Sequence, residues 1–172
     1  FHKEKVYSGD TVSYSPDEYY IKEKPAYVGE IVFNLQGSLS VPGTLLVEDL
    51  VNENTFKAYD LDGNLLVYGE DYVVEVIGTP LTIIRKSITV SSSNASFKYN
   101  GKEQTANSQK DAAITIGSLI EGHTMKVTIS GAITDVGTKE NTISSVVIFD
   151  EQGNNVSAYY NITLKHGELV VY

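Results

Sequence analysis

Apolar and polar residues alternate in short runs along most of the chain. The clearest run covers residues 31–39, where apolar side chains recur at Ile31, Phe33, Leu35 and Leu39. A period of two places these side chains on one face of an extended strand. About seven such runs fall in each half of the chain, separated by Gly, Asn and Asp turn signals. We therefore expect an all-β fold, with short helices at most over residues 17–24 and 108–113, each of about two turns.

The clearest run has a copy further along the chain. Residues 31–44 align without a gap with residues 125–138, and the apolar positions stay in phase. Three aligned pairs are identical: Gly37 with Gly131, Gly43 with Gly137, and Thr44 with Thr138. Because Gly43 and Gly137 each lie between a strand and a threonine, we expect a positive φ or a close approach of the chain at both.

Other segments recur in the same order. The pairs are 6–9 with 98–101, 59–64 with 149–154, 72–78 with 160–167, and 81–83 with 169–171. An internal repeat that keeps its order is typical of tandem domains. We assign residues 1–86 to the first repeat domain and 87–172 to the second. Since no Gly, Ser or Pro linker separates them, we expect a short and fairly stiff joint.

The spacing of strands and turns favours two small β-sandwich domains of the immunoglobulin-like kind. A β-grasp sheet with one short helix in each copy is the alternative, and the pattern leaves the strand order open. The second copy opens with a strand over residues 87–91, whereas the first begins at Phe1, which aligns with about Ser93. We therefore expect the first copy to lack its opening strand, and we interpret the chain as a segment of a longer protein.

Charge and composition narrow the classes of function. The 22 acidic residues outnumber the 13 basic ones, and the net charge of −9 opposes binding to DNA, RNA or anionic lipid. No apolar run approaches the roughly 18 to 20 residues that cross a membrane. The chain has no cysteine, so disulfides and thiolate metal sites are excluded.

Candidate catalytic residues are few. The histidines are His2, His123 and His166. Their spacing suggests neither a metal site nor a Ser-His-Asp triad, and two of them lie beside glycines. We expect turn or surface histidines, no catalytic residues, no cofactor and no metal.

One loop resembles a calcium ligand set. Asp60, Asp62 and Asn64 place oxygen atoms at alternate positions, as short calcium loops do. The EF-hand pattern is not met, because Gly63 falls too early. In the second copy Gln152 replaces the central aspartate while the Gly and Asn are kept. The comparison favours a hairpin turn over a calcium site.

A tyrosine-rich segment distinguishes the first copy. It contains Tyr14, Tyr19, Tyr20 and Tyr27. Exposed tyrosines bring large contact area at little entropic cost, so they suit the recognition of sugars or proteins. Packing in the core or at a sheet edge is the alternative. We choose these four residues as the candidate ligand-contact surface.

The second copy contains short motifs at residues 99–101, 119–123, 135–138 with Asn141, 156–162 and 167–170. Looser counterparts in the first copy are 7–9, 42–44 and 78–83, and the tyrosine-rich insertion departs from the pattern. These motifs resemble bacterial cell-surface repeats of the YDG and MBG type, which form arrays in adhesins, chiefly of Gram-positive bacteria. They specify strands and turns more than any ligand, and the family has no catalytic residues to transfer.

The resemblance implies a non-catalytic structural or adhesive module of a bacterial cell-surface protein, cell wall-anchored or secreted. Its expected partners are neighbouring repeats of the same chain and a host protein or glycan. The alternative is a carbohydrate-binding accessory domain of a secreted glycan-active enzyme. Similar Gram-positive domains carry Lys–Asn isopeptide crosslinks. Lys98 and Asn161 are the candidates here, although an ordinary surface lysine and asparagine are favoured.

Overall fold

The computed structural model describes residues 3–14 and 18–172. The chain divides into two compact units, Phe1–Ile84 and Arg85–Tyr172, whereas the sequence-based boundary lay between residues 86 and 87. The named helical segments are single 3₁₀ turns: η2 (Val47–Leu50), η3 (Gln109–Asp111) and η4 (Ser157–Tyr159). All other named elements are strands, and the expected all-β fold is confirmed. We call the two parts unit 1 and unit 2.

The two expected short helices have different outcomes. Residues 108–113 contain η3, which has a capping box between Ser108 and Asp111. Residues 19–24 have no regular secondary structure, so a helix is wrong there, and Asp17 lies outside the described residues. A helix of two turns is too short to be stable on its own. Pro25 also disfavours helical geometry at the residue before it.

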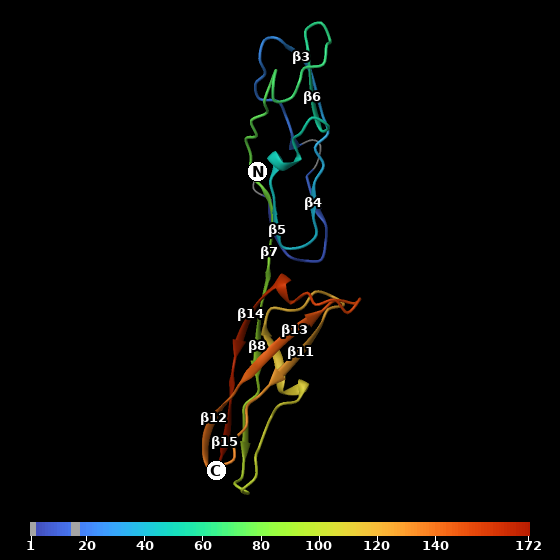
Figure 1. Cartoon of the computed structure of the whole chain (residues 1–172). Coiled ribbons are helices and arrows are strands. Elements are labelled where there is room, and N and C mark those ends of the chain that lie inside the picture. The colour runs from blue at the N-terminus through green and yellow to red at the C-terminus, as the bar shows by residue number, and fades with distance from the viewer. Residues whose placement is uncertain (1–2, 15–17) are drawn as a thin grey trace. The chain divides into compact units, whose positions relative to one another are not determined.

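The described residues of unit 1, 3–14 and 18–84, form seven strands in three small sheets (Figure 1). Their bounds are β1 (Lys3–Val6), β2 (Val12–Ser13), β3 (Val28–Phe33), β4 (Ser38–Leu39), β5 (Gly43–Leu45), β6 (Phe56–Asp60) and β7 (Leu81–Ile84). The first strand and the last one are parallel neighbours, and β5 completes their sheet in the order β1-β7-β5. The other two sheets are the antiparallel pairs β2-β4 and β3-β6.

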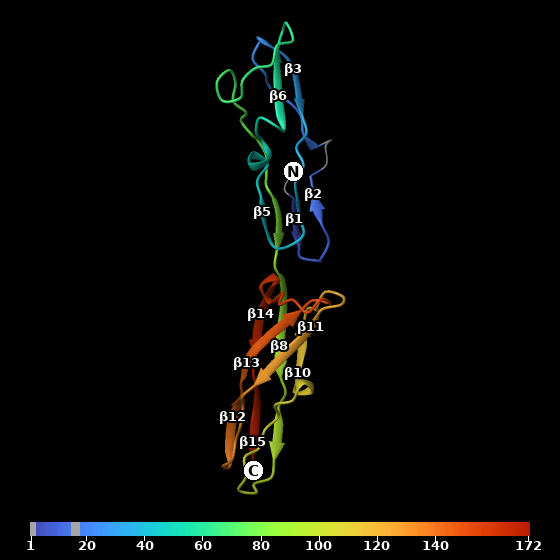
Figure 2. The ribbon, with the colours of Figure 1, turned by 45° about the vertical axis from the view of Figure 1, so that its right-hand side comes forward.

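Unit 2 contains eight strands. Their bounds are β8 (Lys86–Ser92), β9 (Ala95–Phe97), β10 (Ala112–Ile116), β11 (Thr124–Ile129), β12 (Gly137–Asn141), β13 (Ile143–Phe149), β14 (Tyr160–Lys165) and β15 (Gly167–Val171). The sheets are β10-β8-β14, β11-β13 and β12-β15-β9. Figure 2 shows β8 between β10 and β14. Because β8 leads into β9 and β14 leads into β15, two long extended segments run parallel to each other through two sheets.

The strand registers reproduce the sequence repeat residue by residue. The antiparallel pair β3-β6 joins Ile31 to Ala58, and the pair β11-β13 joins Met125 to Ile148. The same correspondence holds in three more ladders: Gly43–Ile83 with Gly137–Val171, Lys3–Leu81 with Ala95–Leu169, and Val12–Leu39 with Gln104–Ile133. The segments that align in sequence therefore occupy equivalent positions in the two sets of sheets.

Apolar residues of the central strands form the cores. Leu81 of β7 and Leu169 of β15 are fully buried, and they are equivalent in the repeat. In unit 2 the opening strand adds Ile88 and Val90, also fully buried, which alternate with more exposed residues. Each fully buried aliphatic side chain of this size contributes about 1.5 to 3 kcal/mol to stability.

The two aligned glycines differ in backbone geometry. Gly137 has a φ of 145°, in a region that side-chain-bearing residues avoid, so the prediction for this residue is confirmed. For Gly43 it is wrong. The φ of Gly43 is not positive, and a Cβ added there would have no atom within 4 Å. Strand β5 starts with ordinary extended backbone, and therefore nothing at Gly43 requires a glycine.

Three strands of unit 2 have no counterpart strand in unit 1. They are β8, β10 and β14, which together form one sheet. The segments of unit 1 that match β10 and β14 in the repeat are residues 18–24 and 72–77. Neither is a strand, and within them only Tyr72 is paired, by an isolated bridge to Tyr68. The position that matches β8 falls before Phe1 in the alignment. Unit 1 thus has two unpaired extended segments where unit 2 has a three-stranded sheet.

Candidate functional site

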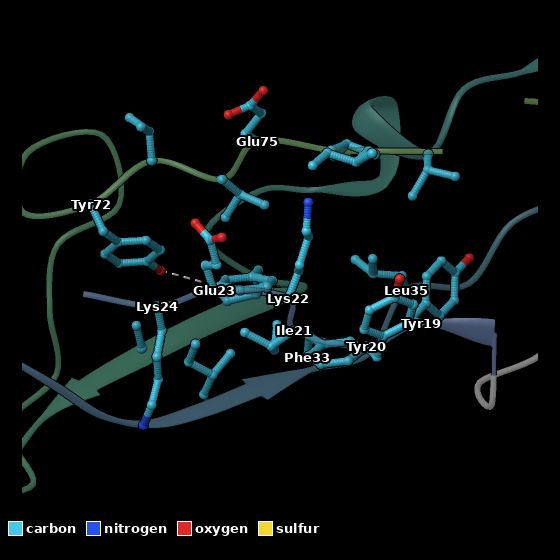
Figure 3. A pocket seen from close by; sticks show the side chains of 18 of the residues that line it. Tyr19, Tyr20, Ile21, Lys22, Glu23, Lys24, Phe33, Leu35, Tyr72 and Glu75 are labelled. Atoms are coloured by element: carbon cyan, nitrogen blue, oxygen red, sulfur yellow. Dashed lines mark hydrogen bonds between the residues drawn. The ribbon is translucent and has the colours of Figure 1, made fainter. Parts of the chain in front are cut away.

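Unit 1 contains a large cavity between these two unpaired segments. Its volume is about 1030 Å³. Residues 18–25 form one wall, residues 70–79 form the other, and residues of β3 and β6 form the floor. We call this cavity the groove. Figure 3 shows Tyr19, Tyr20 and Phe33 grouped at one end of it and Tyr72 at the other.

A chain of aromatic rings runs along the groove. Phe33 of β3 stacks on Phe56 of β6 with ring centroids 5.9 Å apart, and the two rings are nearly parallel. Tyr19 meets Phe33 edge-on at 6.3 Å, and Tyr72 lies 6.1 Å from Phe56 on the other side. Offset-stacked and edge-on contacts at these distances are each worth about 0.5 to 1.5 kcal/mol beyond area burial. The floor is therefore an ordered aromatic surface.

Two of the candidate tyrosines link the walls. The Tyr27 hydroxyl donates a hydrogen bond of 2.8 Å to the backbone carbonyl of Asp71. The Tyr14 hydroxyl lies 3.2 Å from the carbonyl oxygen of Thr79, to which it donates. Each bond joins a tyrosine next to the wall of residues 18–25 to the wall of residues 70–79. These two side chains hold the walls in place, and Tyr27 is also half-exposed.

The other two candidate tyrosines have opposite environments. Burial, with smaller contributions from Tyr14 and Glu18, raises the pKa of Tyr19 to about 12. The Tyr19 hydroxyl oxygen is buried and has no hydrogen-bond partner among the described residues. Tyr20 is 81% exposed. The four tyrosines predicted from sequence therefore line one groove, but only Tyr20 projects freely to solvent, and their role in ligand contact stays a prediction.

Charges of both signs surround the groove. Lys22 and Lys24 lie on one wall together with Glu23, while Asp71 and Glu75 lie on the other. The Lys24 ammonium group donates to the carbonyl of Gly29. In the described part of the chain, no group of three or more His, Cys, Asp or Glu side chains is arranged to hold a metal ion. The groove itself is apolar in its floor and mixed in charge at its rim.

The loop of Asp60, Asp62 and Asn64, for which a hairpin turn was favoured over a calcium site, is a hydrogen-bonded hairpin turn. One carboxylate oxygen of Asp60 accepts the backbone N–H groups of Asp62 and Asn64 at 2.9 and 2.8 Å, and the other accepts the Asn64 side-chain amide at 2.9 Å. Asp150 accepts the same three bonds in unit 2. Gly63 supplies a φ of 85°. The loop's own donors thus occupy both oxygens of Asp60.

These hydrogen bonds also shift the acidity of the two aspartates. The Asn64 side-chain amide, followed by the backbone N–H of Asn64, lowers the pKa of Asp60. The side-chain amide of Asn154 does the same for the pKa of Asp150. A carboxylate that accepts several N–H groups is favoured in its charged form.

Two of the three histidines have structural hydrogen bonds, and His2 lies outside the described residues. His123 Nδ1 lies 2.7 Å from the Tyr160 hydroxyl, which also accepts the backbone N–H of Ile120. Burial raises the pKa of Tyr160. His166 Nδ1 accepts the backbone N–H of Ile143 at 2.9 Å. Both rings connect strands or loops of unit 2.

The candidate isopeptide pair is far apart. Asn161 pairs with Ser87 near the start of β8, while Lys98 follows the end of β9. At about 3.3 Å per residue, the eleven steps from Ser87 to Lys98 span about 36 Å of extended chain. Both side chains are exposed. The fold does not bring these two residues together.

Sequence reasoning missed the second wall and the floor of the groove. Tyr72, Val73 and Ile77 were read as part of a strand, because residues 72–77 alternate and match β14 in the repeat. Val73 and Ile77 are instead 80% and 73% exposed. The available signal was that no segment of residues 1–84 aligns with β8, the strand that pairs with the counterparts of both walls in unit 2.

No family model matches this chain, and neither a curated protein nor a solved structure matches it. In residues 3–14 and 18–172, no helix has the length and apolar character required to cross a bilayer.

Proposed function

We propose that the chain is a non-catalytic structural and adhesive module of a bacterial cell-surface protein, in which repeated domains act as a stalk. The location outside the cell, cell wall-anchored or secreted, is part of this proposal. It rests on the sequence motifs of cell-surface repeats and on one structural observation. In unit 1 the first strand, β1, is the parallel neighbour of the last, β7, and in unit 2 the first two strands, β8 and β9, pair in parallel with the last two, β14 and β15.

Parallel terminal strands suit a module that carries tension along the chain. In unit 2, six residue pairs join β8 to β14 and three join β9 to β15. A force that pulls the two ends of the unit apart slides these strands past each other, so it loads all the intervening hydrogen bonds at once. A force applied at the same end of both strands separates the bonds one after another. The first geometry resists forced unfolding more strongly, and forced unfolding is governed by the unfolding rate.

Single-molecule pulling tests this proposal. The chain has no native cysteine, so one attachment point can be introduced cleanly at the exposed Tyr172 or the exposed Asn161. Pulled against the N-terminus, Tyr172→Cys loads unit 2 in shear, whereas Asn161→Cys pulls the starts of β8 and β14 apart. We expect a clearly higher unfolding force for unit 2 in Tyr172→Cys.

Unit 1 lies in the loaded path of both variants and serves as the internal reference. Its unfolding force should be unchanged between them. Equal unfolding forces for unit 2 in the two geometries would contradict a load-bearing role for the terminal strands.

Recognition of a glycan or a host protein by the groove is the second candidate function, whether in an adhesin or in an accessory domain of a glycan-active enzyme. The exposed ring of Tyr20 at a groove with an aromatic floor favours it. Titration with galactose-, glucose- and N-acetylhexosamine-based oligosaccharides should then shift resonances of groove residues. Tyr20→Ala should abolish the shifts, and Tyr99→Ala, at an exposed tyrosine of unit 2, should not. Shifts that survive Tyr20→Ala would contradict recognition at this site.

A further inference from the structure

Unit 2 shows what fills the position of the groove in a complete repeat. There, β8 lies between β10 and β14, antiparallel to the first and parallel to the second. Its inward residues Ile88 and Val90 are 2% and 0% exposed. The strand leads directly into β9, which is the counterpart of β1 in the repeat. In unit 2, therefore, the space between the two wall segments is occupied by a seven-residue strand.

The walls of the groove in unit 1 are the counterparts of β10 and β14. Residues 19–24 and 73–77 form no backbone–backbone hydrogen bond with another described residue. Both segments therefore present backbone donors and acceptors that a strand could use. Residues 72–77 also keep the alternation of half-buried and exposed side chains that a strand requires.

The groove is apolar where the counterparts of Ile88 and Val90 would lie. In unit 2, Ile88 pairs with Ile162 and Val90 pairs with Leu164. The repeat places Val74 and Val76 at those two partner positions, and both line the groove together with Phe33 and Phe56. Val127, the counterpart of Phe33, is 3% exposed in unit 2, whereas Phe33 is only half-buried. An inserted strand would bury this aromatic floor.

We propose that the groove of unit 1 is an acceptor site for one extended polypeptide strand with the alternating apolar pattern of β8. The strand would run parallel to residues 72–77 and antiparallel to residues 19–24. It would enter in continuity with the N-terminal end of β1, because β8 is joined in this way to β9. Main-chain hydrogen bonds would give the strand its affinity, and the alternation of its apolar side chains would set the register of pairing. This inference does not depend on the proposed stalk function.

The proposal is tested by adding this strand to the N-terminus of the full chain. Counting back from the pairing of Lys3 with Ala95, the seven residues of β8 correspond to the seven positions directly before Phe1. One variant therefore carries Lys-Ser-Ile-Thr-Val-Ser-Ser in front of Phe1. The control carries Lys-Ile-Ser-Val-Thr-Ser-Ser, which has the same composition with the apolar residues shifted by one position. A one-residue shift turns the apolar side chains to the opposite face.

Hydrogen–deuterium exchange is measured on both variants and on the original chain. We expect the first variant to slow exchange at residues 19–24 and 73–77 at least tenfold, while the control leaves it unchanged. Exchange in unit 2 should be the same in all three, which shows that the chain stays folded. Unchanged exchange at the walls in the first variant, or equal slowing in both variants, would overturn the proposal.

Discussion

At the residue scale, residues that align in the repeat do not always have the same backbone geometry. Gly43 and Gly137 are aligned in sequence and pair with equivalent residues, Ile83 and Val171. Only Gly137 has a positive φ, and this difference is invisible in an alignment of identical residues. The aspartates of the two hairpins behave in the opposite way, because Asp60 and Asp150 have the same hydrogen bonds despite different neighbours.

Valine substitutions at the two glycines should therefore differ in cost. Gly137→Val should lower the free energy of unfolding of unit 2 by about 1 to 3 kcal/mol, because valine does not tolerate this φ. Gly43→Val should change that of unit 1 by less than about 0.5 kcal/mol, as surface substitutions do. Denaturant titrations measure both. Similar losses at the two positions would show that backbone geometry is not the cause.

The hairpin of unit 1 should lose stability in acid. Since the pKa of Asp60 is lower in the folded chain than its ordinary value of 3.8, its charged form favours folding above that pH. This contribution disappears as the pH falls through the lower, folded-state pKa. Asp60→Asn should weaken the acid dependence of melting below about pH 4. Asp62→Asn is the control, because its side chain accepts no hydrogen bond from the described residues. Identical acid profiles for Asp60→Asn and the original chain would refute this assignment.

At the element scale, the sequence pattern predicted the strands that pair within the repeat and failed where a strand lacks its partner. The alternation at residues 72–77 is the same kind of pattern as in β14, yet only β14 is paired. Strand pairing depends on a neighbour as well as on local pattern. Over residues 19–24 the expected helix is wrong for a related reason, since this segment belongs to the counterpart of β10 and carries aromatic residues that line the groove. The four tyrosines were identified from the composition of their segment. The aromatic floor that they cover was not identified from the sequence.

The contribution of a single tyrosine hydroxyl between the groove walls to the stability of unit 1 should be measurable. Tyr27→Phe removes the hydroxyl that donates to Asp71, so it should destabilise unit 1 by about 1 kcal/mol. Amide exchange at residues 71–77 should become faster. Tyr20→Phe removes the hydroxyl of a ring that is 81% exposed, so it should leave both quantities unchanged. Equal effects of the two substitutions would show that the hydroxyl of Tyr27 does not hold the walls together.

At the scale of the whole molecule, two units with the same strand registers follow each other with one residue, Arg85, between β7 and β8. The internal repeat made the duplication predictable, and the registers of four ladder pairs agree with the sequence alignment. The parallel pairing of β1 with β7, of β8 with β14 and of β9 with β15 was not predictable, because strand order depends on contacts between residues far apart in the sequence.

Unit 2 should fold without unit 1. A fragment of residues 85–172 retains all eight strands and the buried residues Ile88, Val90, Ile148 and Leu169. It should give a dispersed amide spectrum and a cooperative thermal transition. A fragment without dispersed resonances, obtained while the full chain is folded, would contradict independent folding of the units.

The load-bearing role is tested most directly by pulling the full chain from its two ends. Two separate unfolding events are expected, each releasing about 30 nm of chain at roughly 3.6 Å per residue. The event of unit 1, with four parallel pairs between β1 and β7, should occur at the lower force. The event of unit 2, with its longer parallel ladders, should follow at a higher force. A single event for the whole chain, or unfolding of unit 2 before unit 1, would contradict the account.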